Sequence, residues 1–314
     1  MPVKDRVAAL LVAMLLLACA CTAAAQGVRP GEVHEDGVLV LGRVSDNPRD
    51  HYEQLKPLLD YVVPRLHSVG IREGRVLMAR DAQQMLSYLR RGRVDWITET
   101  AGTAMSFSER GGAQLLVATE RSGVREYHSV FFARRDSGIR SLADLRGRSI
   151  ALQNPSSTSS YFAPAAALLD AGLGMEILLS PHDRPSAGSV GYLFARSEGN
   201  IATWVHKRLV DAGAFSNLDW DDLQRLPPSF RDDLVVFHET APFPRAVELV
   251  RAGLPDAVAT RLREVLLEAA DDPAARVPML HFFNTTRFVP IGEDTRASLV
   301  ELGQGVSRIR DALE

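Results

Sequence analysis

Residues 153–173 read QNPSSTSSYFAPAAALLDAGL, and this stretch decides the predicted fold. It follows an apolar run at 149–152 that predicts a strand, and it leads into a predicted helix over 162–169. The hydroxyl residues Ser156 to Ser159 stand where that helix begins. A helix N-terminus has about four backbone N–H groups without intrahelical partners and a partial positive charge. Hydroxyl donors there predict an anion site without Lys or Arg, although a Ser N-cap with spare serines is the alternative.

Strands and helices alternate on both sides of this stretch. Apolar runs predict strands at 38–41, 75–78, 94–97, 115–118, 129–133, 149–152, 177–179, 211–214 and 234–237. Helical spacing predicts helices at 55–66, 82–89, 101–110, 142–145, 162–169, 201–209, 254–269 and 294–312. This alternation is typical of an α/β fold with largely parallel sheets. The length of 314 residues suggests about two domains, at roughly 150 residues each.

Composition excludes several classes of function. The net charge is −3, so there is no excess of Lys and Arg to hold a nucleic acid. Both cysteines, Cys19 and Cys21, lie in the first 25 residues. The rest of the chain therefore has neither a disulfide nor a cysteine zinc site, and we expect no cofactor or metal.

The N-terminus has the features of a secretory signal. Lys4 and Arg6 precede an apolar run, and Ala23, Ala24 and Ala25 follow it, so residues 1–25 are predicted to be a signal peptide. The run is shorter than the ~20 apolar residues that span a bilayer. Cleavage after Ala25 would release a periplasmic protein, whereas LLAC at 16–19 resembles a lipoprotein box that would leave a lipid anchor at Cys19. Both routes remain open at this point.

The hydroxyl-rich stretch also resembles a known protein family. Ser157, Thr158 and Ser159, followed by an aromatic residue, Pro164 and Gly172, resemble the phosphonate/phosphate-type substrate-binding proteins of ABC importers, a family that also takes phosphite. Three further segments resemble the family in the same order: LADLRGR at 142–148, VDAGA at 210–214 and FVPI at 288–291. The resemblance covers about residues 38–300.

The resemblance implies a two-lobe type II periplasmic-binding-protein fold. Each lobe would be a mainly parallel sheet flanked by helices, with two hinge crossovers and closure around a ligand. Lobe 1 would comprise residues 36–126 and 240–314, and lobe 2 residues 127–239. The implied function is capture of a small oxyanion (phosphonate, phosphite or phosphate) by a monomer that delivers it to an ABC permease complex. A membrane sensor kinase that reports phosphate, phosphite or arsenite is the alternative partner.

Candidate ligand-binding residues follow from the resemblance and from positions after predicted strands. The family's oxyanion positions match Ser157, Thr158 and Ser159, and Ser160 replaces the family's glycine. Other candidates near predicted strand ends, the first crossover or the cleft are Ser45, Asn47, Thr100, Thr103, Tyr127, His128, Tyr192, Asp211 and Asn217. For several of these, a cap or hinge role is the alternative.

Glu99 departs from the family pattern. Glu99 and Thr100 stand where the family has Gly-Pro before an aromatic residue. A carboxylate at this position would repel a dianion, so Glu99 predicts a ligand that carries a proton or an amine. A surface position is the alternative for Glu99.

Enzyme motifs are missing from the sequence. It contains no Gly-x-Ser-x-Gly elbow, no His-Glu-x-x-His and no Walker A motif, and no two of the eight histidines are spaced i, i+4. We therefore expect a binding protein and not an enzyme.

Overall fold

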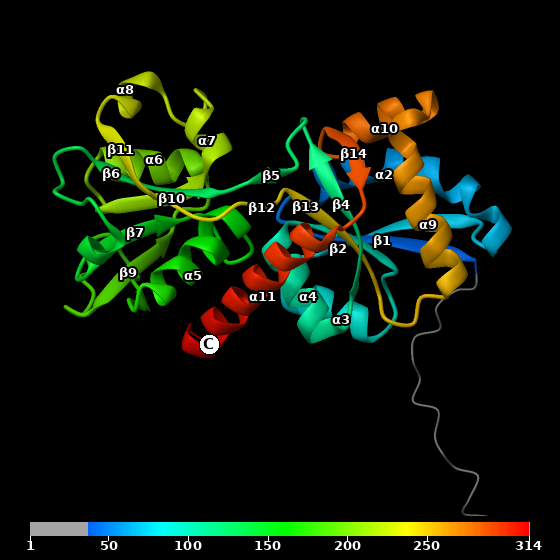
Figure 1. Ribbon diagram of the computed structural model, residues 1–314, viewed down its shortest axis with the longest axis horizontal. Helices are drawn as coiled ribbons and strands as arrows, with labels where there is room; N and C mark the ends of the chain where they lie inside the picture. The colour runs from blue at the N-terminus through cyan, green and yellow to red at the C-terminus, as the bar shows by residue number, and fades with distance from the viewer. Residues whose placement is uncertain (1–36, 314) are drawn as a thin grey trace, which may run out of the picture. The chain divides into compact units, whose positions relative to one another are not determined.

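The computed structural model describes residues 37–313 (Figure 1). The predicted signal peptide and the alternative anchor at Cys19 lie outside the described residues. Within 37–313, no helix is both long and apolar enough to cross a membrane. The same residues contain no group of three or more His, Cys, Asp or Glu side chains placed to hold a metal ion.

The first sheet has six strands from both ends of the described chain. Its order is β14(Thr285–Val289), β4(Gln114–Arg121), β13(Ala246–Val250), β3(Trp96–Glu99), β1(Val38–Val44) and β2(Glu73–Ala79). β1 pairs in parallel with β2 and β3, whereas β13 pairs antiparallel with β3 and β4. Its helices are α2(Pro48–Arg65), α3(Ala82–Arg90), α4(Ala101–Gly111), α9(Asp256–Glu268) and α10(Arg276–His281). Two apolar clusters, around Leu41 and Phe107, form the core.

The second sheet is built entirely from the middle of the chain. Its order is β11(Leu234–Glu239), β6(Ser129–Arg134), β10(Ala212–Ser216), β7(Ser149–Leu152), β9(Ser189–Phe194) and β8(Gly174–Ile177). β7, β8, β9 and β10 pair in parallel, and β6 pairs antiparallel with β10 and β11. Its helical segments include η2(Leu142–Leu145), the π-turn η3(Thr158–Phe162), α5(Ala163–Asp170), α6(Glu198–His206), α7(Asn217–Asp221) and α8(Pro228–Arg231).

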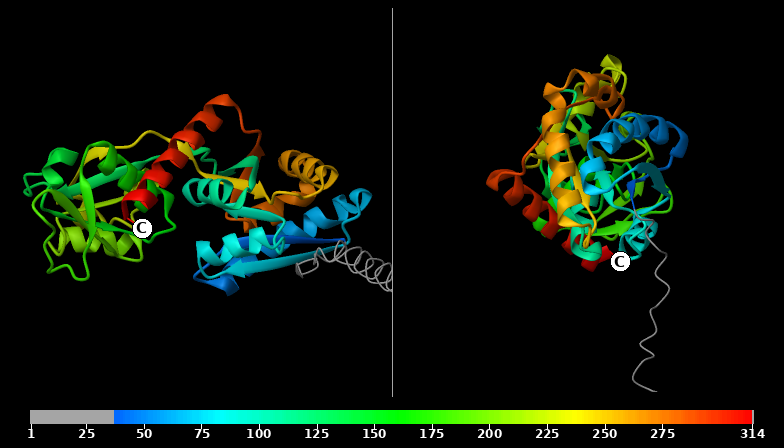
Figure 2. Two further views of the ribbon diagram at one scale, coloured as in Figure 1. Left: turned by 90° about the horizontal axis from the view of Figure 1, so that it is seen from below. Right: turned by 90° about the vertical axis from the view of Figure 1, so that its right-hand side faces the viewer.

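The chain passes between the two sheets three times. Two passes contain the short strands β5(Glu126–Tyr127) and β12(Phe243–Pro244), which pair antiparallel with each other. The third pass is the helix α11(Glu293–Leu313), which runs from beside α4 to beside α5 (Figures 1 and 2). Leu299 packs in the core of the first sheet and Ile309 in the core of the second. The resemblance implied two crossovers between the lobes, and α11 makes a third connection that was not predicted.

Local signals account for several element ends. The Asp81 side chain accepts a hydrogen bond from the Gln84 amide at 2.7 Å, so it caps α3. Gly112 ends α4 with a φ of 68°, which a residue without a side chain adopts at little cost. In α2, Pro48 at the first turn fits the helix, but Pro57 and Pro64 lie inside it.

The predicted α/β class is confirmed, with one strand misplaced. Antiparallel strands occupy one side of each sheet, so each is mixed. The strand predicted at 177–179 is β8 at Gly174–Ile177, and the strands β9, β13 and β14 were not predicted. Gly191 interrupts the apolar pattern of β9, so the sequence did not mark this strand. Only glycine fits there, because a Cβ would lie 2.5 Å from the Leu178 side chain. The lobe boundaries stay a prediction.

Candidate functional site

A cavity of about 530 Å³ lies where loops from both sheets meet. Most of its lining follows the carboxyl ends of β1, β2, β3, β7, β9 and β10, where ligands of open α/β sheets bind. Residues 43–46, His51, Glu99 and Thr100 form what we term the first-sheet wall, and residues 153–159 form the second-sheet wall. The remaining lining residues are Arg80, Asp81, Tyr127, Glu198, Ser216, Leu218, Asp219, Arg225 and Arg245.

Two helix N-termini meet at this cavity. Ser157 caps η3, which continues directly into α5, and its Oγ accepts a hydrogen bond from the Ser160 amide at 3.1 Å. Thr158 Oγ1 accepts a hydrogen bond at 2.8 Å from the amide of Gly102, in the first turn of α4. That bond leaves the Thr158 hydroxyl proton free to be donated to a ligand.

Close packing holds the two N-termini together. Thr103 Oγ1, on α4, donates a hydrogen bond to the Ser156 carbonyl at 3.0 Å. A Cβ on Gly102 would lie 2.5 Å from the Phe162 ring, so only glycine fits there without a shift. The positive ends of two helices, one beside each sheet, therefore face the same cavity.

Glu99 is buried in the first-sheet wall, so the alternative of a surface position is wrong. It is 4% exposed, and its Oε1 accepts a hydrogen bond from the Val44 amide at 2.8 Å. Burial raises the pKa of Glu99, and the nearby guanidinium groups of Arg43 and Arg121 partly oppose that rise. Glu99 therefore gains a proton more readily than an exposed carboxylate does.

Ser45 and His51 form a hydrogen-bonded pair beside Glu99. Ser45 Oγ lies 2.6 Å from His51 Nδ1, and it also accepts a hydrogen bond from the Asn47 amide at 3.1 Å. Burial, with help from Arg43, lowers the pKa of His51 to about 4, so its imidazole is neutral at pH 7. The pair supplies neutral hydrogen-bonding groups to the cavity.

Half of the predicted ligand-binding residues line the cavity. They are Ser45, Glu99, Thr100, Tyr127, Ser157, Thr158 and Ser159. The hydroxyl of Ser159 forms a hydrogen bond with Tyr127, which is 4% exposed. Their role in binding stays a prediction.

The other seven predicted residues lie outside the lining, and their side chains have other contacts. Ser160 Oγ donates to the Ala214 carbonyl, Asp211 accepts from Ser149, and Asn217 accepts from the His128 amide. The remaining contacts are Asn47 with Asp50, Thr103 with Ser156, His128 with Glu239, and Tyr192 with Tyr161 and Phe194. These side chains hold the fold around the cavity.

Several lining residues were not predicted from the sequence. They include Arg43, His51, Arg80, Gln153, Asn154, Asp219, Arg225 and Arg245. Arg80 and Asp219 follow strand ends, a position that could have singled them out. Arg43 lies inside β1 and Arg245 lies in a crossover, where no motif marks either residue.

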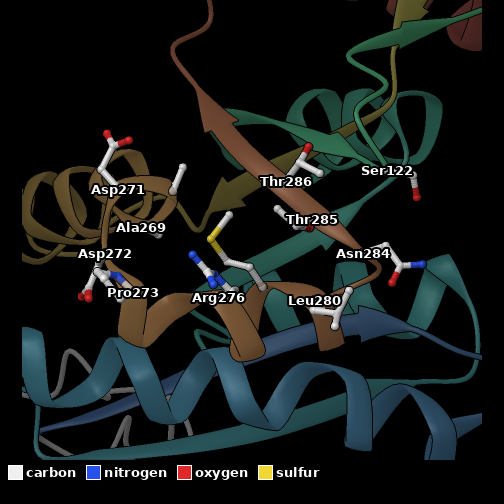
Figure 3. Close-up of a pocket in the computed structure, with 12 residues that line it drawn as sticks. Ser122, Ala269, Asp271, Asp272, Pro273, Arg276, Leu280, Asn284, Thr285 and Thr286 are labelled. Atoms are coloured by element: carbon white, nitrogen blue, oxygen red, sulfur yellow. The ribbon is translucent and has the colours of Figure 1, made fainter.

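A second cavity, of about 450 Å³, lies beside the first sheet. Figure 3 shows Arg276 and Leu280 on α10 opposite Thr285 and Thr286 on β14. Asp271 and Asp272 also line it, and none of the predicted binding residues do. With two carboxylates and one guanidinium, this cavity is less suited to an anion than the first.

The chain is similar to known proteins in sequence and in fold. The family model described as "ABC transporter, phosphonate, periplasmic substrate-binding protein" matches residues 42–295. XAC2383 from Xanthomonas citri, solved bound to a chloride ion, is 57% identical over 88% of this chain and 99% of that chain, with a TM-score of 0.84. The same protein solved bound to ATP is 56% identical over 88% of this chain and 100% of that chain, also at a TM-score of 0.84.

A more distant structure shows that the fold is shared more widely. PhnD1 from Prochlorococcus marinus, solved with methylphosphonate, is 17% identical over 87% of this chain and 99% of that chain, with a TM-score of 0.62. The fold is thus the two-lobe α/β fold of type II periplasmic binding proteins. This family serves transport and is not a family of enzymes. The family model matches most of the chain, and the chain belongs to the phosphonate family of periplasmic substrate-binding proteins of ABC transporters.

Proposed function

We propose that this protein captures a phosphorus oxyanion group in the cavity between the two sheets and delivers its ligand to an ABC importer. The observation that carries the proposal is the Thr158 hydroxyl, bound by the Gly102 amide at 2.8 Å with its own proton free. It places a hydroxyl donor between two helix N-termini, where an anion is favoured. The donors of the second-sheet wall are neutral, so they bind the oxyanion by hydrogen bonds.

The size of the cavity favours a ligand with an organic part. A volume of about 530 Å³ falls in the range of roughly 300–1,000 Å³ that is usual for pockets of drug-sized ligands. A free phosphate or phosphite ion would fill little of it. The 56% identical Xanthomonas citri protein was solved bound to ATP, which carries phosphoryl groups on an organic body. Both points support a phosphonate or an organic phosphate over a bare ion.

Export and delivery complete the proposal. The family is periplasmic and partners ABC permeases, which supports a periplasmic location and a permease partner here. A sensor kinase partner, a monomeric state and a lipid anchor stay predictions, and no contact among residues 37–313 favours them.

The test is calorimetric titration of the purified full chain. The ligand panel is phosphate, phosphite, methylphosphonate, 2-aminoethylphosphonate, ATP and sulfate. Thr158→Val removes the hydroxyl but keeps the shape, so it should weaken binding of the best phosphorus ligand about tenfold or more.

The matched control is Thr203→Val on α6, whose hydroxyl bonds only to the Gly199 carbonyl within its own helix. It should leave affinity unchanged. Equal affinities for wild type and Thr158→Val would contradict the proposal, as would a panel in which no phosphorus compound binds.

A further inference from the structure

Three arginines gather on the first-sheet side of the cavity without an acidic partner. Arg43 and Arg245 line the cavity, and Arg121 lies behind them at 5% exposure. Among residues 37–313, no carboxylate oxygen lies within 4.0 Å of the charged nitrogens of Arg43, Arg121 or Arg245. Unpaired buried charge is costly, so this positive charge favours an anion nearby.

The nearest acids are engaged elsewhere. Glu99 accepts from the Val44 amide at 2.8 Å. Glu248 is fully buried and accepts three hydrogen bonds, from Trp96 Nε1 at 2.7 Å and from the hydroxyls of Thr98 and Thr119 at 2.8 Å each. Neither carboxylate forms an ion pair with the arginines.

Much of the hydrogen-bonding capacity of these guanidinium groups is unused. Arg43 Nη1 donates to the Thr98 carbonyl at 3.3 Å, and Arg121 Nη2 donates to Thr98 Oγ1 at 3.1 Å. The Nε atoms of both Arg43 and Arg121 are buried without a partner. A guanidinium offers five N–H donors, so Arg43 retains donors for a ligand that enters the cavity.

The ring of Phe283 supports two of the arginines. Its centre lies 4.3 Å from Arg43 Cζ and 4.5 Å from Arg121 Cζ. Phe283 has a φ of 54°, a strained value for an aromatic residue. The two cation–π contacts help to offset this strain and the repulsion between the guanidinium groups. Burial, then repulsion by Arg43 and Arg245, lowers the pKa of Arg121 to about 9.

The other two arginines of the cavity are neutralised. Arg225 lies 2.9 Å from Glu198, and Arg80 lies 3.1 Å from Asp81. Among the arginines that line the cavity, Arg43 and Arg245 are therefore the two without a carboxylate oxygen within 4.0 Å in residues 37–313. This contrast separates the first-sheet side from the rest of the cavity.

We propose that Arg43 and Arg245 bind a second anionic group of the ligand, distinct from the phosphorus oxyanion group held at Thr158. The inference rests on the proposed function and narrows it. The ligand class is then a phosphonyl or phosphoryl compound with a further carboxylate or phosphoryl group.

The test compares ligands that differ only in the second anionic group. Calorimetry of the full chain measures dissociation constants for methylphosphonate, phosphonoacetate and 3-phosphonopropionate. Wild type should bind at least one phosphonocarboxylate about tenfold more tightly than methylphosphonate. Arg43→Gln and Arg245→Gln should each remove most of that advantage and leave methylphosphonate within about twofold, while Arg43→Lys should retain part of it.

The matched control is Arg231→Gln, which removes an arginine outside the cavity that lies 2.9 Å from Asp221. It should leave the preference for the second anionic group intact. Equal weakening of all three ligands by Arg43→Gln, or no weakening, would overturn the inference. If wild type binds methylphosphonate but gains nothing from the carboxylate, this inference fails and the proposed function stands. If wild type binds none of the three compounds, both fail for phosphonates.

Discussion

The two walls of the cavity offer an anion different chemistry. The second-sheet wall offers hydroxyl groups and backbone amides around Thr158, all neutral and all from one stretch of chain. The first-sheet wall offers guanidinium and carboxyl groups, with Arg43 and Glu99 from different strands. Neutral donors recognise the shape of an oxyanion, whereas arginines respond to its charge. We therefore expect the second-sheet wall to recognise the phosphorus oxyanion group of the ligand. The first-sheet wall would recognise the charge on the rest of the ligand.

The largest effect is expected where the two walls join. Gly102→Ala adds a Cβ that would lie 2.5 Å from the Phe162 ring, so it forces α4 away from η3. The hydrogen bond from the Gly102 amide to Thr158 Oγ1 then breaks. The N-termini of both helices would move away from the ligand. We expect phosphonate affinity to fall about tenfold to a hundredfold, measured by calorimetry.

The control for this variant is Gly199→Ala. Gly199 holds the same second position in α6, and an added Cβ would contact nothing within 4 Å. It should bind phosphonate as wild type does. If Gly102→Ala also binds phosphonate with normal affinity, the contact between the N-termini of α4 and η3 is not needed for binding. The two walls would then not depend on each other.

The sequence singled out three residues in each wall, but it missed the arginines on the first-sheet side. Residues 153–159 form one local segment, so their hydroxyl pattern and strand–helix context can be read directly. Arg43 and Arg245 are 202 positions apart, and only the pairing of β1, β3 and β13 brings their segments into one sheet. No local pattern reports such an assembly.

Most strands could be predicted from apolar runs, but the sequence did not show which end of a strand faces the cavity. Asp211 precedes β10, so it lies at the amino end of that strand, whereas the cavity lies at the carboxyl ends. There it accepts hydrogen bonds from the amide and hydroxyl of Ser149, at the start of β7. The VDAGA segment at 210–214 marks the strand but not the end that faces the cavity, so the sequence placed Asp211 at the wrong end.

A smaller effect is expected from Glu99 and pH. Burial raises the pKa of Glu99, so the carboxyl holds its proton above the usual carboxyl range, and a bound anion favours that proton further. Affinity should therefore fall as pH rises through the raised pKa, by a few-fold. Glu99→Gln should flatten this dependence, measured by calorimetry of one phosphonate across pH 4.5–8.

The ligand's own titration is common to both proteins, so the ratio of their affinities isolates Glu99. Arg121 faces the same carboxyl group and stays charged over this range, since its lowered pKa is about 9. A ratio that does not change with pH would show that Glu99 is either always charged or always neutral when ligand binds. The charge of the first-sheet wall would then not change with pH between 4.5 and 8.

The smallest effect concerns stability and His51. Burial lowers the pKa of His51 to about 4 from a usual 6.5, so the unfolded chain binds this proton more readily than the folded protein does. The stabilisation is present above pH 6.5 and is lost as pH falls toward 4. The side chain is partly exposed, which reduces the effect to about 1 kcal/mol. Chemical denaturation at pH 7 and pH 4.5 should show a smaller loss for His51→Gln than for wild type.

His238 also has a pKa lowered by burial, so it supplies a comparison within the same protein. It lies on β11 of the second sheet, outside the ligand cavity, and contributes acid sensitivity that His51→Gln leaves in place. His51→Gln should therefore reduce the loss of stability without abolishing it, and His238→Gln should reduce it separately. Equal losses for wild type and His51→Gln would mean that burial does not lower the proton affinity of His51 in the folded protein. Glu99 could not account for the loss, because a carboxyl with a raised pKa loses stability as pH rises and not as it falls.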